Sequence, residues 1–201
     1  MMETHEMNSM LRFLERYMEP TEDEINLVLS TNRVKAFKKN ETIRSFGSAS
    51  REVYFVLSGC VYSLYRGHED LVVGEVFFTG EPVLIPASEE GEDSLYEIRS
   101  VGPTTLAVSM ADEVEQNTRA FPRFERVCRL FAEEMLARKT RFHDHLRRLS
   151  PLEKYLYVFK ERRQLILEVP QHLLANYLGM TPETLSRVRR QIATGELDLN
   201  Q

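Results

Sequence analysis

The chain has 201 residues, of which 42% are hydrophobic and 28% are charged. This balance suits one or two globular domains and excludes a disordered or collagen-like chain. No stretch approaches the ~20 apolar residues that a membrane span requires. The acidic N-terminus also lacks the basic-then-apolar order of a signal peptide, so we expect a cytoplasmic protein with no membrane partner.

The two parts of the chain carry opposite net charge, although the total is only −5. Residues 1–118 hold 10 basic and 21 acidic side chains, a net charge of −11. Residues 119–201 hold 16 basic and 10 acidic side chains, a net charge of +6. A basic C-terminal part behind an acidic N-terminal part is typical of a protein whose C-terminal part contacts a polyanion.

Metal-binding residues are few. Cys60 and Cys128 cannot supply a cysteine-rich metal or iron–sulfur site, and we expect both to be buried reduced thiols, with a single disulfide as the alternative. His68 is expected in a turn. His143 and His145 are two residues apart on a predicted helix and face different sides, so they do not form a chelating pair. We therefore predict no metal or cofactor.

Residues 9–110 predict helices followed by strands. Pro20 divides the apolar residues of segment 9–30 into two short helices, and Thr21 with Glu24 forms a capping box at the start of the second. From residue 33 to 110 the pattern changes to short β-rich runs separated by turn residues, with no room for a helix. Gly59, Gly67 and Gly80 are expected in turns with positive φ. These features predict an antiparallel sandwich or barrel.

Residues 121–149 predict one long helix. Its apolar side chains recur at alternating three- and four-residue steps, a heptad pattern interrupted at Arg138 and His145. Such a stripe packs either on the β-domain of the same chain or on the same helix of a second subunit. We expect the second arrangement. The expected dimer-helix residues are Phe121, Phe124, Cys128, Phe131, Met135 and Phe142.

The C-terminal segment predicts a helix-turn-helix. Pro151 starts a short helix, and residues 165–167 read as a brief strand or turn. After Pro170 an apolar helix ends at Gly179, expected as a left-handed C-cap. Thr181 then caps a second helix with Pro182 at its first position. The three-residue connection between the two helices is the turn of a helix-turn-helix.

The outer face of the second helix carries side chains that can bind the base edges of DNA. Arginine bonds guanine bidentately, glutamate accepts from the cytosine amino group, and serine donates or accepts. The alternative is a plain helical hairpin with a solvated charged face. The expected base-reading residues are Glu183, Ser186 and Arg187. The expected DNA-backbone contacts are Lys154, Gln171, Thr181, Thr184, Arg189 and Arg190.

Two passages, VYFVLSGCV at 53–61 and LGMTPETLSR at 178–187, resemble the Crp-Fnr family of bacterial transcription regulators. The resemblance implies a homodimer that binds palindromic double-stranded DNA and contacts RNA polymerase. In the Fnr-like branch the pattern E-x-x-S-R reads a TTGA-type half-site, and Glu183, Ser186 and Arg187 match it. Pro182 stands where cyclic-AMP-responsive members often have another arginine, which favours TTGA over TGTGA.

The resemblance also places an effector pocket in the β-domain, at Gly80, Glu81 and Ser94. Cyclic-nucleotide binders follow the Gly-Glu pair with a phosphate-binding arginine about ten residues later, and this chain has none there. Acidic residues at 89–93 would repel a phosphate, and Arg99 is a poor substitute because it falls in the next strand. We therefore expect an unknown effector, or none, and no tight binding of cyclic AMP or cyclic GMP.

We thus predict an α+β fold: an N-terminal antiparallel β-roll of the jelly-roll type, a long dimerisation helix, and a C-terminal helix-turn-helix whose wing is reduced or absent. The domains are 1–118, 119–149 and 150–201. One alternative is a cupin-type enzyme, which the single β-region histidine disfavours. The other is a ligand- or protein-binding β-roll with a helix-turn-helix that no longer binds DNA.

Overall fold

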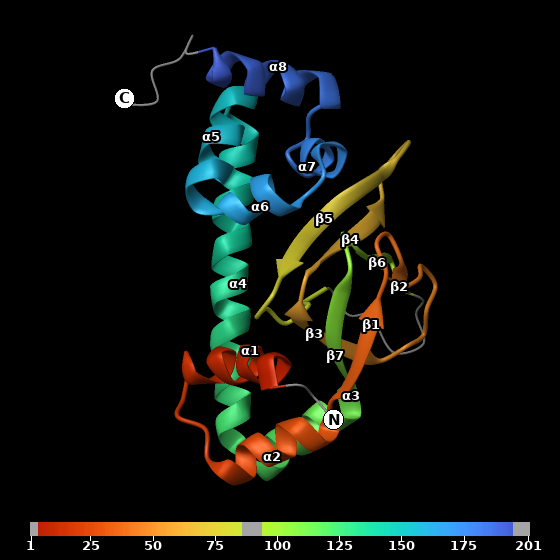
Figure 1. Ribbon diagram of the computed structural model, residues 1–201, viewed down its shortest axis with the longest axis vertical. Coiled ribbons are helices and arrows are strands. Elements are labelled where there is room, and N and C mark those ends of the chain that lie inside the picture. The colour runs from red at the N-terminus through yellow and green to blue at the C-terminus, as the bar shows by residue number, and fades with distance from the viewer. Residues whose placement is uncertain (1–3, 86–93, 195–201) are drawn as a thin grey trace.

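The computed structural model describes residues 4–85 and 94–194, and its elements follow the predicted order (Figure 1). Helices α1 (Thr4–Glu15) and α2 (Glu22–Thr31) precede the strands. The capping box of α2 is present: the Thr21 hydroxyl accepts the Glu24 amide at 3.3 Å, and the Glu24 carboxylate accepts the Thr21 amide at 2.8 Å. Both predicted N-terminal helices are confirmed.

The predicted β-roll consists of two antiparallel sheets. One has the strand order β1-β7-β3, and the other has the order β2-β6-β4-β5, so β5 is an edge strand. No helix interrupts the described part of segment 33–110. The strands are β1 (Arg33–Phe37), β2 (Thr42–Arg44), β3 (Glu52–Ser58), β4 (Cys60–Arg66), β5 (Leu71–Phe78), β6 (Tyr96–Ser100) and β7 (Thr104–Met110).

Two of the three predicted positive-φ glycines have that conformation. Gly59 and Gly80 both have φ +87°, which a glycine reaches without steric cost. The prediction for Gly67 is wrong, since its φ is not positive. Gly67 is needed for a different reason: a Cβ there would lie 2.7 Å from the carbonyl oxygen of Asp70, across the β4–β5 turn.

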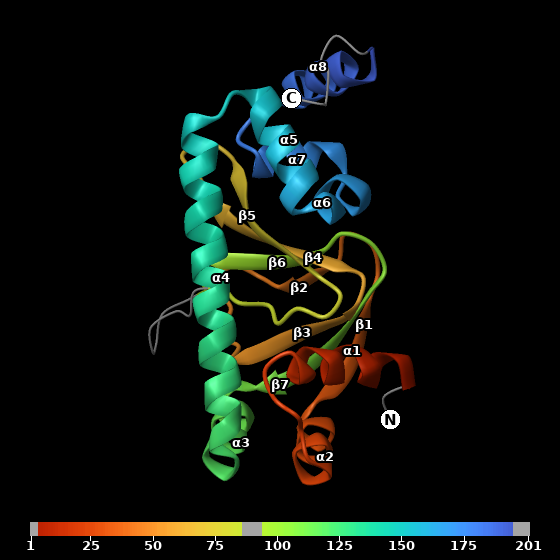
Figure 2. The same ribbon diagram turned by 90° about the vertical axis from the view of Figure 1, so that its left-hand side faces the viewer.

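The C-terminal half is helical. Helix α4 runs along one side of the whole molecule, beside the roll at one end and the C-terminal helices at the other (Figure 2). No helix among the described residues is long and apolar enough to cross a membrane. The helices are α3 (Ala111–Ala120), α4 (Pro122–Arg148), α5 (Pro151–Glu161), α6 (Arg163–Glu168), α7 (Gln171–Tyr177) and α8 (Pro182–Ala193).

The brief strand expected at 165–167 is wrong, because these residues belong to α6. An isolated strand there would need a partner for its backbone groups, whereas a short helix satisfies them locally. The Val169 amide, for example, donates to the Leu165 carbonyl at 3.3 Å. The Leu165 side chain is fully buried in the C-terminal core.

Five of the six predicted dimer-helix residues pack on their own chain, which corrects the predicted dimer face, and Cys128 is the exception because it is exposed. Phe124, Phe131 and Met135 are at most 6% exposed and belong to the core that the roll forms with α1. Phe142, 7% exposed, belongs to a second core formed by strands β4 and β5 with α5–α8. Phe121 packs partly buried on the first core. The spacing fits any adjoining apolar surface, and here the chain itself supplies that surface.

A different face of α4 is open. Cys128, Ala132 and Leu136 recur at four-residue steps and are exposed, with Leu136 exposed by 68%. This corrects the prediction that both cysteines are buried: Cys60 is buried and Cys128 is exposed. Both thiols are free, so the alternative of a disulfide is excluded.

Candidate nucleic-acid interface

Helices α7 and α8 form the predicted helix-turn-helix. Gly179 ends α7 with φ +64°, and the Met180 amide donates to the Ala175 carbonyl at 3.0 Å. The Thr181 hydroxyl caps α8 by accepting the Thr184 amide at 3.2 Å. Pro182 occupies the first turn of α8, where a missing amide hydrogen costs nothing.

The inner face of α8 fixes the helix to its own domain. Leu185 is fully buried and Val188 is 3% exposed. On α7, Leu174 and Ala175 are also buried, and all four side chains share one core. The small Ala175 is fully buried in this core and its carbonyl accepts the Met180 amide of the turn, so the orientation of α8 relative to α7 is set by packing.

The outer face of α8 is free for a partner. Glu183, Ser186 and Arg187 are all exposed on the same helix. The hydrogen bond from its own amide, and then the one from the Thr181 hydroxyl, lower the pKa of the Glu183 carboxyl. Glu183 is therefore ionised at neutral pH and only accepts hydrogen bonds, as a partner of an amino group must. The three predicted base-reading residues thus lie together.

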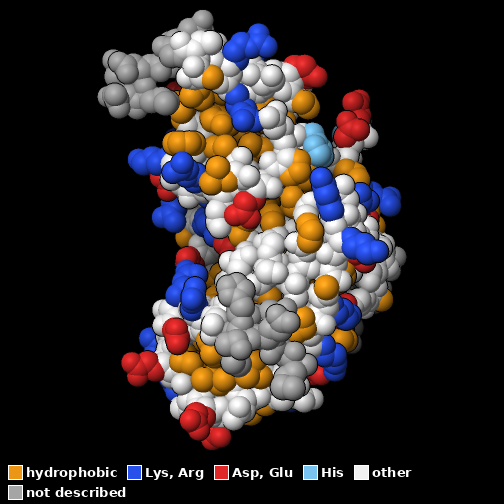
Figure 3. Space-filling view, viewed as in Figure 1, with side chains coloured by type: hydrophobic (Ala, Val, Ile, Leu, Met, Phe, Trp, Pro, Cys, Tyr) orange, Lys and Arg blue, Asp and Glu red, His pale blue; other side chains and the backbone are white. Residues whose placement is uncertain are grey.

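The predicted DNA-backbone residues differ in exposure, and some of them bond within the chain. Gln171, Arg189 and Arg190 are exposed. Lys154 is half-buried instead, and its ammonium donates to the Leu178 carbonyl at 3.2 Å, which closes the end of α7. The hydroxyls of Thr181 and Thr184 lie 3.2 Å apart and bond each other. Lysine and arginine side chains are visible over α8 and beside α4, and acidic side chains are visible both near α8 and at the opposite end of the molecule (Figure 3).

The structure does not bring the three predicted effector residues together. The Glu81 carboxylate accepts from Arg138 of α4 at 2.9 Å and from the Phe78 amide at 3.0 Å. Ser94 is buried and lines a separate cavity of about 420 Å³, and neither Gly80 nor Glu81 is among the lining residues. The acidic segment 89–93 and the predicted reduced wing at 195–201 lie outside the described residues.

The predicted histidine positions agree with the structure. His68 is exposed in the turn between β4 and β5. His143 and His145 are both exposed on α4, and the His145 ring stacks on Tyr157 with ring centres 4.5 Å apart. Within residues 4–85 and 94–194 no group of three or more possible ligands is placed to hold a metal ion.

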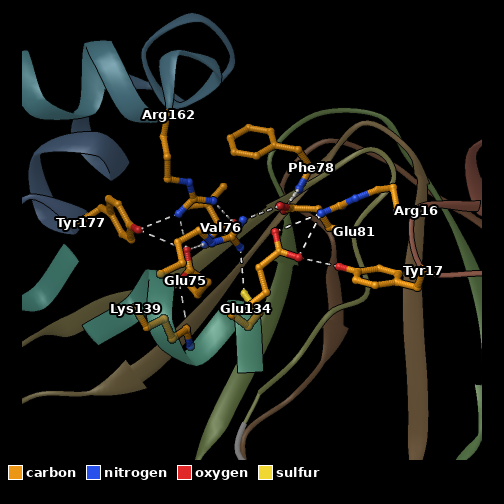
Figure 4. A network of polar contacts seen from close by, with 12 residues as sticks. Arg16, Tyr17, Glu75, Val76, Phe78, Glu81, Glu134, Lys139, Arg162 and Tyr177 are labelled. Atoms are coloured by element: carbon orange, nitrogen blue, oxygen red, sulfur yellow. Dashed lines mark hydrogen bonds and ion pairs between the residues drawn. The ribbon is translucent and has the colours of Figure 1, made fainter. Parts of the chain in front are cut away.

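A buried polar cluster that the sequence analysis missed connects the roll to the helix-turn-helix. We call Glu75, Arg162 and Tyr177 the interdomain cluster; their side chains point toward one another from β5, the α5–α6 junction and α7 (Figure 4). Arg162 donates to the Glu75 carboxylate at 2.6 Å and to the Tyr177 hydroxyl at 2.8 Å. These residues also line a cleft of about 430 Å³ between α4, α5 and β5.

No family model matches the chain, and no curated protein matches its sequence. Solved structures do. FixK2 from Bradyrhizobium japonicum is 18% identical with a TM-score of 0.69, covering 85% of this chain and 89% of FixK2. CLP from Xanthomonas campestris, described as a c-di-GMP responsive global regulator, is 18% identical with a TM-score of 0.68, covering 88% of this chain and 94% of CLP. A CooA mutant from Carboxydothermus hydrogenoformans is 16% identical with a TM-score of 0.70, covering 96% and 88% of the two chains.

The chain has the Crp-Fnr fold. The similarity extends over roll, long helix and helix-turn-helix together, since each of these three matches covers at least 85% of this chain. Within the Crp-Fnr fold the outer face of α8 is an exposed surface that no other described element of this chain covers. The predicted fold class, including the β-roll and the long helix, is confirmed.

Proposed function

We propose that the chain is a homodimeric DNA-binding transcription regulator of the Crp-Fnr kind. The observation that carries the proposal is the outer face of α8, where Glu183, Ser186 and Arg187 are exposed together beyond a rigid buried face. This is the arrangement of a recognition helix whose N-terminal residues contact bases in the major groove. The pattern E-x-x-S-R supports a TTGA-type half-site, and the family suggests RNA polymerase as a further partner.

The effector of the proposed regulator is not a tightly bound cyclic nucleotide. The Glu81 carboxylate is ion-paired to Arg138 of α4, and Ser94 lies in a different cavity. Among residues 4–85 and 94–194, a phosphate would therefore meet neither a free cation nor a converging set of donors at the predicted pocket. Titration of the protein with cyclic AMP and cyclic GMP, followed by calorimetry, tests this expectation; micromolar binding would contradict it.

Selection of random duplex DNA by the full-length protein tests the function directly. A regulator of this kind recovers a palindrome whose half-sites lie about 34 Å, or one helical turn, apart. Its affinity for the selected site also falls steeply with salt concentration, because bound phosphates release counterions. Recovery of no sequence preference at near-physiological salt, with or without cell extract, would refute DNA reading and favour a roll that binds another partner.

Two arginines of α8 are expected to contribute differently to DNA binding, one to base preference and the other to affinity for all sequences. Arg187→Ala should cost about 1–3 kcal/mol of binding to the selected site and relax the preference at one base pair. Arg189→Ala should weaken all DNA sequences alike and reduce the slope of affinity against salt by about one. Binding of matched specific and scrambled duplexes measures both effects. Uniform weakening by both variants would contradict the assignment of Arg187 to base reading.

The open face of α4 supports the homodimer. Leu136 is 68% exposed and continues the stripe that begins with the smaller side chains of Cys128 and Ala132, and one side of α4 is uncovered in both ribbon views (Figures 1 and 2). Leu136→Glu is expected to raise the dimer dissociation constant at least about tenfold, since burying a leucine contributes about 1.5–3 kcal/mol. Analytical ultracentrifugation measures this, with the exposed Glu133→Gln as control; an unchanged dimer would place the interface elsewhere.

A further inference from the structure

Glu75 is a charged residue in the interior of an otherwise apolar strand. Its side chain is 5% exposed. It accepts from Arg162 at 2.6 Å, from Tyr177 at 3.1 Å and from the Val76 amide at 3.1 Å, with the Lys139 ammonium 3.9 Å away. A buried carboxylate is tolerated only when it is paired and hydrogen-bonded in this way, so the Glu75 side chain has one defined set of partners.

The guanidinium of Arg162, the partner of Glu75, is also buried and hydrogen-bonded. Its side chain is 12% exposed. One guanidinium nitrogen donates to the Val76 carbonyl at 2.8 Å, while the other bridges Glu75 and Tyr177. Arg162 separates α5 from α6, and Tyr177 is the last residue of α7. The interdomain cluster therefore attaches the helix-turn-helix domain to β5 at two places, the α5–α6 junction and the end of α7.

A second contact fixes α7 to the edge of the roll. The Asn176 side chain accepts the Val73 amide at 2.7 Å and donates to the Leu71 carbonyl at 3.0 Å. These are two backbone groups of the edge strand β5. The Tyr177 ring also stacks on Phe142 of α4, with ring centres 4.9 Å apart. Thus α7 is tied to both the roll and the long helix, and α8 follows α7 after a turn of four residues.

We propose that the interdomain cluster is a positioning device that fixes α8 relative to α4. This inference rests on the proposed function. If α4 carries the dimer interface, the orientation of α8 relative to α4 determines the separation of the two recognition helices. The cluster then determines whether both helices reach their half-sites at once.

The chemistry of the cluster suits this task better than apolar packing would. Apolar side chains accept many relative positions, whereas the bonds of Arg162 to Glu75, Tyr177 and the Val76 carbonyl have defined directions. Buried ionic groups confer orientation in several proteins at no gain in stability. Tight binding of a duplex with two half-sites requires that both copies of α8 in the dimer contact their half-sites at the same time. This gain in affinity is lost when the relative geometry of the two copies is not maintained.

The test compares two duplexes: the selected palindrome and the same duplex with one half-site scrambled. Glu75→Gln removes the charge and retains the size of the side chain. Because this change leaves Arg162 buried without its partner, the double variant Glu75→Leu/Arg162→Met replaces both charges by apolar groups of similar size. Glu161→Gln is the matched control, since it removes the exposed charge next to Arg162. Hydrogen exchange of the Val73 amide reports whether α7 has left β5.

We expect both cluster variants to bind the palindrome at least about tenfold more weakly while half-site affinity stays as in the wild type. The control should equal the wild type, and Val73 should exchange faster in the cluster variants alone. A folded double variant with the wild-type ratio of palindrome to half-site affinity overturns the inference. Tighter binding of the palindrome by a cluster variant than by the wild type overturns it as well. Absence of any preferred DNA in the wild-type protein would instead refute the proposed function.

Discussion

Arg162→Ala is expected to lower the free energy of unfolding by about 3–5 kcal/mol, because the buried Glu75 carboxylate loses the cation that hydrogen-bonds it, and the Lys139 ammonium at 3.9 Å is too distant to replace those bonds. Both side chains are at most 12% exposed, so the Glu75 carboxylate is little solvated once its partner is lost. Urea denaturation of the full chain measures the change. The neighbouring Arg163 is exposed and stacks on the Phe159 ring, which makes Arg163→Ala the control, expected within about 0.5 kcal/mol of the wild type.

The same variant should change the response of stability to acid. Burial raises the pKa of Glu75, but the charge and hydrogen bond of Arg162 outweigh burial and hold that pKa below its ordinary value of 4.5. A carboxyl whose pKa is lower in the folded state contributes stability above its unfolded pKa and loses it as pH falls through the folded pKa. The stability difference between wild type and Arg162→Ala should therefore be largest near neutral pH and shrink in acid. A difference independent of pH, or one no larger than that of Arg163→Ala, would contradict the ion pair.

Leu185→Ala is expected to cost about 2–5 kcal/mol, the range for removing a fully buried leucine side chain from a packed core. Leu185 is 0% exposed and packs in the core that α8 shares with α5, α7 and strands β4 and β5. Because the cavity left by the substitution lies under α8, the proposed recognition helix, DNA affinity should fall together with stability. Thermal denaturation and DNA binding of the same preparation measure both.

Ser186→Ala is the matched control for Leu185→Ala. Ser186 is exposed on the next position of the same helix, so its removal should leave the denaturation midpoint unchanged and reduce DNA affinity alone. The prediction fails if Leu185→Ala retains the wild-type midpoint, or if Ser186→Ala destabilises the fold as much. The pair thus separates the packing of α8 from its contacts with DNA.

Local signals in the sequence were sufficient for the elements and for the candidate reading surface. The capping box at Thr21, the glycine at 179 and the cap at Thr181 each act within a few residues of the chain, and all three are present. The exposed triplet Glu183, Ser186 and Arg187 follows from helical spacing once the buried face of α8 is known. Short-range spacing determines such features, so they are readable without a structure.

Features that depend on distant parts of the chain were not predicted correctly. The heptad spacing of Phe124, Phe131 and Met135 indicated an apolar partner, but not whether this partner was a second subunit or the roll. Glu75 and Arg162 are 87 residues apart, and nothing in their spacing joins them. The one available signal was a single glutamate within the apolar run LVVGEVFF, since a charge inside a buried strand requires a partner.

The bonds of Asn176 with β5 have a consequence for solubility. An edge strand exposes unpaired backbone groups on which a strand of another molecule can assemble, and natural proteins cover or interrupt such edges. Strand β5 is apolar along most of its length, and Asn176 occupies the free amide of Val73 and the free carbonyl of Leu71. The docked helix α7 therefore also shields this edge against intermolecular β-aggregation, and any movement that lifts the helix-turn-helix uncovers it.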